Sequence, residues 1–183
     1  RDLGRTQFRI AEIKASQHDL AIALEEIEKS QAIHLSLWHS EPTSTMYARD
    51  LSAAQSLGAL LEHRSGQAEG TLSKSEVAYR RMRAPDLSHS KRSIALDAAM
   101  ISHRYGTLLE AHDYRERAQE AYQWGLSQLP SEDESGTLEL AVRHQLQYSI
   151  QSEQVRSVIV ERLSSYAFND PRFPALLADD AEL

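Results

Sequence analysis

An internal repeat with a period of 48 residues is the feature that most restricts how this chain can fold. The tripeptide Arg-Asp-Leu occurs at residues 1–3 and again at residues 49–51. Further matches at the same spacing join Gln7 to Gln55, Ala11 to Ala59, Leu24 to Leu72, Gly58 to Gly106 and residues 60–62 to residues 108–110. A fixed period of this length is typical of folds that stack one supersecondary unit. We therefore predict that the chain uses the same piece of structure several times.

Two helices are expected in each repeat. Leu20, Ala23, Leu24 and Ile27 follow the spacing of three and four residues that places side chains on one buried helical face. A proline follows each predicted second helix, where it cannot continue the helical hydrogen bonding: Pro42, Pro85 and Pro130. Each repeat is therefore predicted to be a pair of antiparallel helices closed by a proline.

A shorter fourth pair is predicted over residues 135–150 and 152–168, and Asn169-Asp170-Pro171 ends it. The predicted architecture is all-α, with eight helices in four antiparallel pairs. The expected repeats cover about residues 1–48, 49–96, 97–131 and 132–168, followed by a C-terminal tail or cap at residues 169–183.

The third repeat carries a family resemblance. Its sequence resembles a tetratricopeptide repeat, because large, small and closing positions follow the spacing of that family: Tyr105-Gly106, Leu109, Ala118, Tyr122, Gly125 and Pro130. The turn at His18-Asp19-Leu20 is similar to the one at His112-Asp113-Tyr114. The resemblance implies a right-handed helical-repeat solenoid that binds a protein or peptide and catalyses nothing. The period exceeds the family's usual period of about 34 residues, and such long units resemble the helical-repeat regions of bacterial signalling proteins such as serine/threonine kinases. This implies a regulatory or sensor region cut from a larger protein.

Two glycines are expected at helix crossings. A glycine inside a helix costs about 1 kcal/mol relative to alanine, so Gly58 and Gly106 need a compensating role. In the family that the chain resembles, the two helices of one repeat cross closely, and a residue without a side chain lets them touch. We therefore expect both glycines to lie between the paired helices of their own repeats.

Composition excludes several classes of function. The chain has 20 basic and 27 acidic residues and a net charge of −7, which argues against nucleic-acid binding because that binding depends on neutralising phosphates. Cysteine is absent, so disulfides and thiolate chemistry are excluded, while the cytoplasm and the bacterial periplasm both stay compatible. No apolar run approaches the roughly 20 residues of a membrane span.

Catalytic and metal-binding motifs are not found in the sequence. The eight histidines do not form the spacings typical of metal ligands. Neither a Gly-x-Ser-x-Gly nucleophile motif nor a glycine-rich phosphate loop occurs. The sequence therefore predicts that the protein is not an enzyme and uses no metal or cofactor.

A binding groove is the strongest functional candidate. The resemblance implies that the first helices of the repeats line a concave surface that takes an extended peptide or a partner helix. Small or polar residues are expected to face it: Gln7, Ala11, Lys14, Gln55, Ala59, Glu62, His63, His103, Thr107 and Glu110. We expect Glu62 and Glu110 to be exposed at equivalent positions, where they would anchor a basic or polar ligand.

A basic cluster offers a second candidate surface, and two other functions stay open. Around the link between the second and third repeats lie five basic residues, interrupted by Asp86: Arg80, Arg81, Arg83, Lys91 and Arg92. This cluster would dock an acidic peptide, a phosphate or a membrane surface. The alternatives to partner binding are self-association into a homo-oligomer and a small-molecule sensor pocket between repeats.

Overall fold

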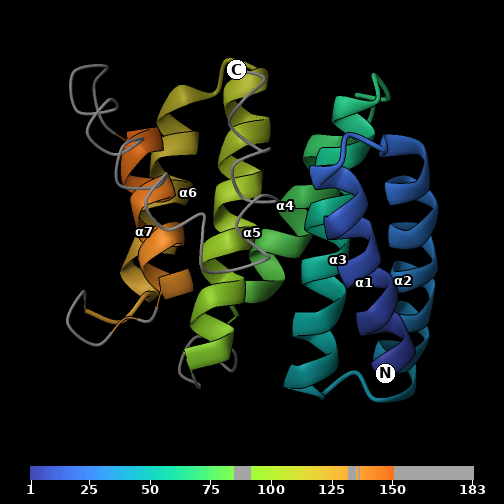
Figure 1. The fold of residues 1–183 in the computed structure, drawn as a ribbon. Coiled ribbons are helices and arrows are strands. Elements are labelled where there is room, and N and C mark those ends of the chain that lie inside the picture. Colours follow the sequence, from blue (N-terminus) through green and yellow to red (C-terminus); the bar gives the residue numbers. More distant parts are fainter. Residues whose placement is uncertain (85–91, 132–134, 136, 151–183) are drawn as a thin grey trace. The chain divides into compact units, whose positions relative to one another are not determined.

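The computed structural model describes residues 1–84, 92–131, 135 and 137–150, and within these residues it contains seven helices and no strand (Figure 1). The helices are α1 (Asp2–Ser16), α2 (Leu20–Ser40), α3 (Thr45–Arg64), α4 (Thr71–Met82), α5 (Arg92–Ala111), α6 (Arg115–Gln128) and α7 (Thr137–Ile150). The predicted all-α class is therefore confirmed for the described part of the chain. The predicted eighth helix at 152–168 and the tail at 169–183 lie outside the described residues.

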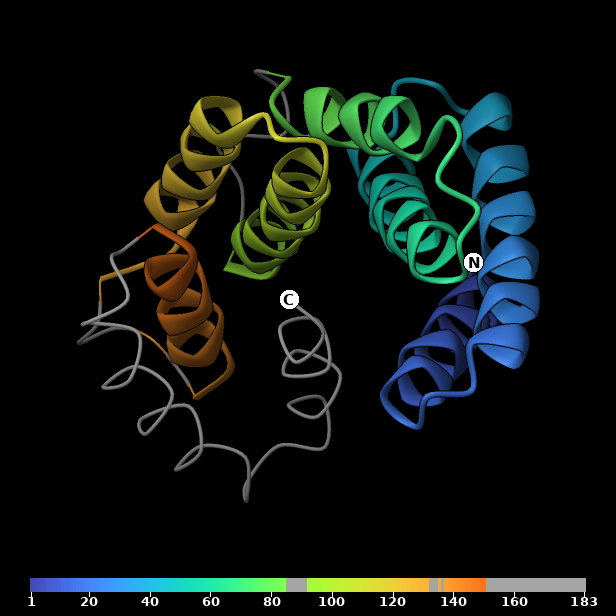
Figure 2. The ribbon, with the colours of Figure 1, turned by 90° about the horizontal axis from the view of Figure 1, so that it is seen from above.

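The chain divides into two compact units, Arg1–His89 and Ser90–Leu183. In the first unit, α2 packs against both α1 and α3, and α4 packs against α3 (Figure 2). In the second, α5 pairs with α6, and α7 packs against both. The repeat boundary expected near residue 96 falls inside α5, which begins at Arg92.

Small aliphatic residues build the core of the first unit. Its central cluster joins three helices: Ala11 and Ala15 of α1, Ala23 and Ile27 of α2, and Ala54, Leu57 and Leu61 of α3. Leu20 and Leu24 pack against this cluster, as their spacing predicts. Alanine side chains let helix backbones approach closely, and burying the larger aliphatic side chains contributes about 25 cal/mol per Å² of apolar surface.

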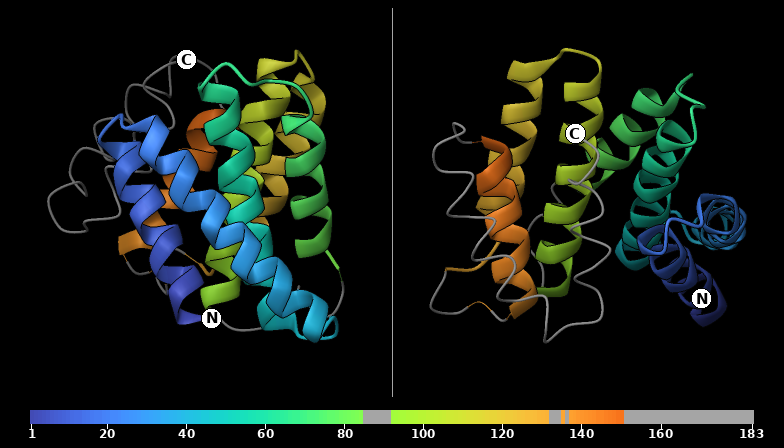
Figure 3. Two further views of the ribbon diagram at one scale, coloured as in Figure 1. Left: turned by 90° about the vertical axis from the view of Figure 1, so that its right-hand side faces the viewer. Right: turned by 45° about the horizontal axis from the view of Figure 1, so that its top comes forward.

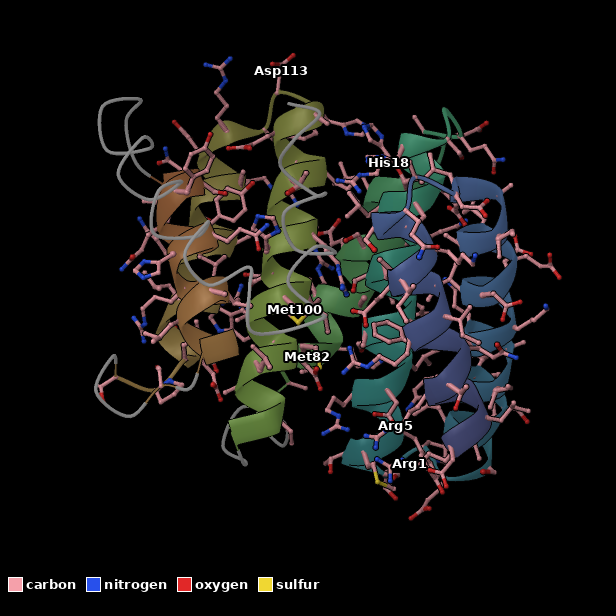
Figure 4. The ribbon with its side chains drawn as sticks, in the orientation of Figure 1. Arg1, Arg5, His18, Met82, Met100 and Asp113 are labelled. Atoms are coloured by element: carbon pink, nitrogen blue, oxygen red, sulfur yellow. The ribbon has the colours of Figure 1, made fainter. Side chains whose placement is uncertain are left out.

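Three helix ends share one backbone geometry. His18, Gly66 and Asp113 adopt positive φ values of 58°, 85° and 63°, each just after a helix (Figure 4 labels His18 and Asp113). In each case the next residue's N–H donates over 2.9 Å to the carbonyl five residues back, as in Asp19 to Lys14. This is the Schellman arrangement, which satisfies carbonyls that a helix end leaves without partners.

The three turns also correct the register of the sequence repeat. His18 and Gly66 are 48 residues apart, but Gly66 and Asp113 are only 47 apart. The turn therefore matches His18 with Asp113, not with His112 as the sequence comparison predicts. By the same register, Gly58 corresponds to Tyr105 and not to Gly106.

Gly58 and Gly106 have different neighbours as a result. A Cβ atom on Gly106 would overlap the ring of Tyr122 on α6, so this glycine lies at the crossing of α5 with its own partner helix, as expected. A Cβ atom on Gly58 would overlap Nε2 of Gln31 on α2. The prediction for Gly58 is therefore wrong, because the glycine faces the helix that precedes α3 and not its partner α4.

Candidate functional site

Two predicted groove residues on α3 are engaged with α4. Gln55 Oε1 accepts a hydrogen bond of 2.7 Å from Arg81 Nη1, and Glu62 accepts two bonds of 2.6 and 2.8 Å from Lys74 Nζ. The Glu62 side chain is only 17% exposed. The expectation that Glu62 is an exposed anchor is therefore wrong, because its carboxylate already pairs with a lysine of the neighbouring helix.

The other groove residues of the first unit are buried or half-buried. Ala11 on α1 and Ala59 on α3 are fully buried, so the expectation that they face a groove is wrong. Gln7 and Lys14 on α1 and His63 on α3 are half-buried. Gln7 Oε1 is buried and accepts no hydrogen bond from any described residue. These side chains are partly covered by neighbouring residues and do not form an open polar surface.

The groove residues of the second unit are also turned inward. His103 and Thr107 on α5 are buried, the His103 ring lies 5.8 Å from the Tyr122 ring, and Thr107 Oγ1 donates to the His103 carbonyl over 3.1 Å. Glu110 is half-buried. A register slip of one residue turns a helix position by about 100°, so Glu110 corresponds to His63 and not to Glu62. The two glutamates are not equivalent anchors.

The arginines of the predicted basic cluster each contact a different neighbouring residue. Arg80 forms an ion pair of 2.7 Å with Glu76, and the Arg83 guanidinium lies 5.4 Å from the centre of the Tyr79 ring. The Lys91 position and the Arg92 side chain lie outside what the structure describes.

Arg81 points into the first unit. It donates to Ser52 Oγ over 3.2 Å as well as to Gln55, and its guanidinium lies 5.1 Å from the centre of the Trp38 ring on α2. Burial lowers the pKa of Arg81 below its usual value. Arg81 therefore links α2, α3 and α4, which makes it part of the fold and removes it from the docking surface predicted for this cluster.

A cluster that the sequence comparison did not predict surrounds Asp50 on α3. Asp50 is 7% exposed and accepts hydrogen bonds from three arginines: Arg1 Nε at 3.0 Å, Arg5 Nη2 at 3.1 Å and Arg49 Nη2 at 2.9 Å. Arg1 and Arg5 lie one turn apart at the same end of the unit (Figure 4). Burial raises the pKa of the Asp50 carboxyl, but the bonds from Arg5, Arg1 and Arg49 outweigh it and hold the pKa below its usual value.

A buried histidine lies behind this cluster. His34 on α2 is 1% exposed, and its Nδ1 has no hydrogen-bond partner among the described residues. A Cβ atom on Gly4 of α1 would lie 2.8 Å from His34 Nε2, so the glycine makes room for the ring. Burial lowers the pKa of His34, against the opposing effect of Asp50. No sequence motif includes Gly4 or His34, so the contact between them could not be predicted from the sequence.

Two large aliphatic residues of α1 point away from its unit. Leu3 is 62% exposed and Ile13 is 52% exposed, while the buried side of the helix carries Glu12 and the small residues Gly4, Ala11 and Ala15. We call the exposed side the outer face of α1 and define it by Asp2, Leu3, Thr6, Ile10 and Ile13. With 100° per residue these five positions fall on one side of the helix. Figure 3 shows α1 at the edge of its unit.

The matching face of α3 is covered. Moving the outer face by 48 residues gives Asp50, Leu51, Ala54, Gly58 and Leu61, and Leu51, Ala54 and Leu61 are each 0% exposed. Ala54 and Leu61 pack in the core with α1 and α2, and Gly58 lies against Gln31 of α2. The outer face of α1 therefore lacks, within the described residues, the cover that a helix pair gives to the matching face of α3.

Comparison of the chain with protein-family models, with curated proteins and with solved structures finds no match. Among the described helices, none combines the length and the apolar character needed to cross a membrane. In the same residues, no group of three or more histidine, aspartate or glutamate side chains is placed to hold a metal ion.

Proposed function

We propose that the chain is a non-catalytic, protein-binding helical-repeat module, and that it serves as a regulatory or sensor region of a larger bacterial signalling protein. A right-handed, tetratricopeptide-like solenoid is the architecture that we propose for it. Two observations support that architecture: the three helix ends with one Schellman geometry, and the pairing of α1 with α2, α3 with α4 and α5 with α6.

The outer face of α1 is the observation that carries the binding proposal. Burying a leucine or isoleucine side chain is worth about 1.5–3 kcal/mol relative to leaving it in water. α1 instead exposes Leu3 and Ile13, while its fully buried apolar positions carry alanine and glycine and only Phe8 among its large apolar residues packs against the core. Contiguous exposed apolar residues with a polar rim mark interaction surfaces, whereas single ones carry no meaning. The partner proposed for this face is a protein that covers it with helices, as α1 and α2 cover α3.

A paired substitution tests this function. Leu3→Gln with Ile13→Gln should abolish capture of a partner from an extract of the native organism and leave the melting temperature nearly unchanged, because both side chains are exposed. The matched control is Ile22→Gln with Leu35→Gln, which changes two exposed aliphatic residues of α2. Capture that survives the α1 pair as well as it survives the α2 pair would refute the proposed surface.

Light scattering on the same variants separates partner binding from self-association. If the parent chain forms an oligomer that only the α1 pair dissociates, the outer face joins copies of this chain. A monomeric parent that still captures a partner supports the proposal as stated.

A further inference from the structure

Asp2 and Asp50 occupy the same place in two copies of one tripeptide, yet their surroundings are opposite. Asp50 is buried beneath three arginines. Asp2 is exposed, and no basic side chain among the described residues pairs with its carboxylate. Arg1 accounts for this difference. Arg49 donates to the aspartate that follows it, Asp50, whereas Arg1 does not bind Asp2 and donates to Asp50 instead. Asp2 is therefore left as an acidic group at the edge of an apolar face.

The contact between α1 and α3 shows what such an aspartate binds. Arg1 and Arg5 are four residues apart, which places both on one side of α1, and they reach the two oxygens of one carboxylate. Beside this charge contact, Gln31 Nε2 of α2 donates to the Ala54 carbonyl of α3 over 3.1 Å. The N-terminal end of α1 thus supplies the positive charges that bind Asp50, and α2 supplies the Gln31 side chain that packs on α3 beside them.

We propose that the outer face of α1 binds a helix pair of a partner protein, and that the first helix of this pair carries two basic residues one turn apart that engage Asp2. The inference rests on the proposed function and names the chemistry of the partner. A second copy of this chain does not supply these residues from α1, because its own Arg1 and Arg5 are bound to Asp50.

The apolar part of the face adds one condition on the partner. Ile10 stands where α3 has Gly58, and Gly58 lies against the side chain of Gln31. An isoleucine in that place fills the space that Gln31 uses on α3. The second helix of the partner must therefore carry a small residue, such as alanine, opposite Ile10.

A fused copy of the chain's own first helix pair serves as the probe. Residues 1–48 are joined in front of Arg1, with Gln31→Ala in the added copy to make room for Ile10. We expect one cooperative unfolding transition and a rise in Tm of about 3 °C or more relative to the parent chain. Asp2→Asn in the resident copy should remove most of this rise and leave the Tm of the parent unchanged.

Several outcomes overturn the inference. A rise in Tm that ignores Asp2→Asn shows that the face does not use this chemistry. A separate low-temperature transition of the added pair, or no rise in Tm, shows that the first probe does not fit the face. A second probe keeps Gln31 in the added copy and carries Ile10→Gly in the resident one, which reproduces the surface of α3. If neither probe gains stability, the inference fails.

Charge reversal in the unfused chain distinguishes this failure from failure of the proposed function. Asp2→Arg should abolish the partner capture that the Leu3 and Ile13 pair abolishes, whereas Glu28→Arg, on an exposed position of α2, should not. If Leu3→Gln with Ile13→Gln abolishes capture but Asp2→Arg does not, the outer face of α1 binds a protein and the proposed basic residues of the partner are refuted.

Discussion

A hydrogen bond of 3.0 Å runs from Arg1 Nε to Asp50 Oδ2, across 49 positions of the chain. It joins the arginine of one Arg-Asp-Leu tripeptide to the aspartate of the next. Because Arg5 and Arg49 bind the same carboxylate, the bond is part of a network that fastens α1 to α3. The repeated tripeptide is therefore a contact between neighbouring helices as well as a marker of the period.

Asp50→Asn should destabilise the first unit by about 1–3 kcal/mol, because the charge-assisted hydrogen bonds from three arginines lose their charged acceptor. The side chains of Arg1 and Arg5 are 29% and 43% exposed and regain water, which keeps the loss below that of a fully buried pair. Urea unfolding measures the difference. Asp2→Asn is the matched control and should stay within about 0.5 kcal/mol of the parent.

Gly106→Ala should destabilise the chain by about 1–3 kcal/mol, because the new methyl group overlaps the ring of Tyr122, which is fully buried. Gly58→Ala should cost less. Its methyl group meets the end of the flexible Gln31 side chain, and alanine recovers about 1 kcal/mol of helix propensity. Thermal unfolding of the two variants compares them directly, and equal losses would contradict this difference.

Glu62→Lys should weaken the contact of α3 with α4, because it places two positive charges where Glu62 now pairs with Lys74 over 2.6 Å. Adding Lys74→Glu should restore most of the loss. The pair is partly exposed, so a double-mutant cycle should give a coupling of about 0.2–1 kcal/mol. A coupling of zero would show that the ion pair does not contribute to stability.

Stability should fall as the pH drops below 6.5, the ordinary pKa of a histidine, because burial lowers the pKa of His34 in the folded chain. The unfolded state then binds a proton that the folded state does not bind until the pH falls through its own lower pKa. Urea unfolding between pH 5 and pH 7.5 checks this, with the range chosen above the titration of Asp50. His34→Gln should reduce the slope, and an unchanged slope would assign it to other groups.

The helices themselves could be predicted from the sequence, because apolar spacing and prolines act locally. The register between distant helices could not. Residues 60–62 and 108–110 have the same sequence and are 48 residues apart, whereas the equivalent turn residues Gly66 and Asp113 are 47 residues apart. Residues that match in the sequence therefore lie on different sides of α3 and α5. One residue of drift turns a position by about 100°, which places His103 where α3 has the buried Ser56. Thr107 is buried in either register, because Ala59 and Leu60 are both buried on α3.

The candidate site was hidden from sequence reasoning for a related reason. Asp50 binds arginines that are distant in the sequence, and the sequence pattern does not show which neighbouring helix covers Leu3 and Ile13. Only a comparison of the exposures of α1 and α3 reveals the uncovered face. In the same way, the sequence places Arg81 in a basic surface cluster, whereas the structure shows that it contacts Trp38 and Gln55.

The stacking of Arg81 on Trp38 also provides an optical reporter. The chain contains two tryptophans, and each compact unit holds one of them, Trp38 in the first and Trp124 in the second. Unfolding of the first unit separates the indole of Trp38 from its guanidinium neighbour and changes its emission. With Trp38→Phe and Trp124→Phe variants, fluorescence follows each half of the molecule separately, and coincident or staggered transitions reveal whether the two halves melt as one cooperative body.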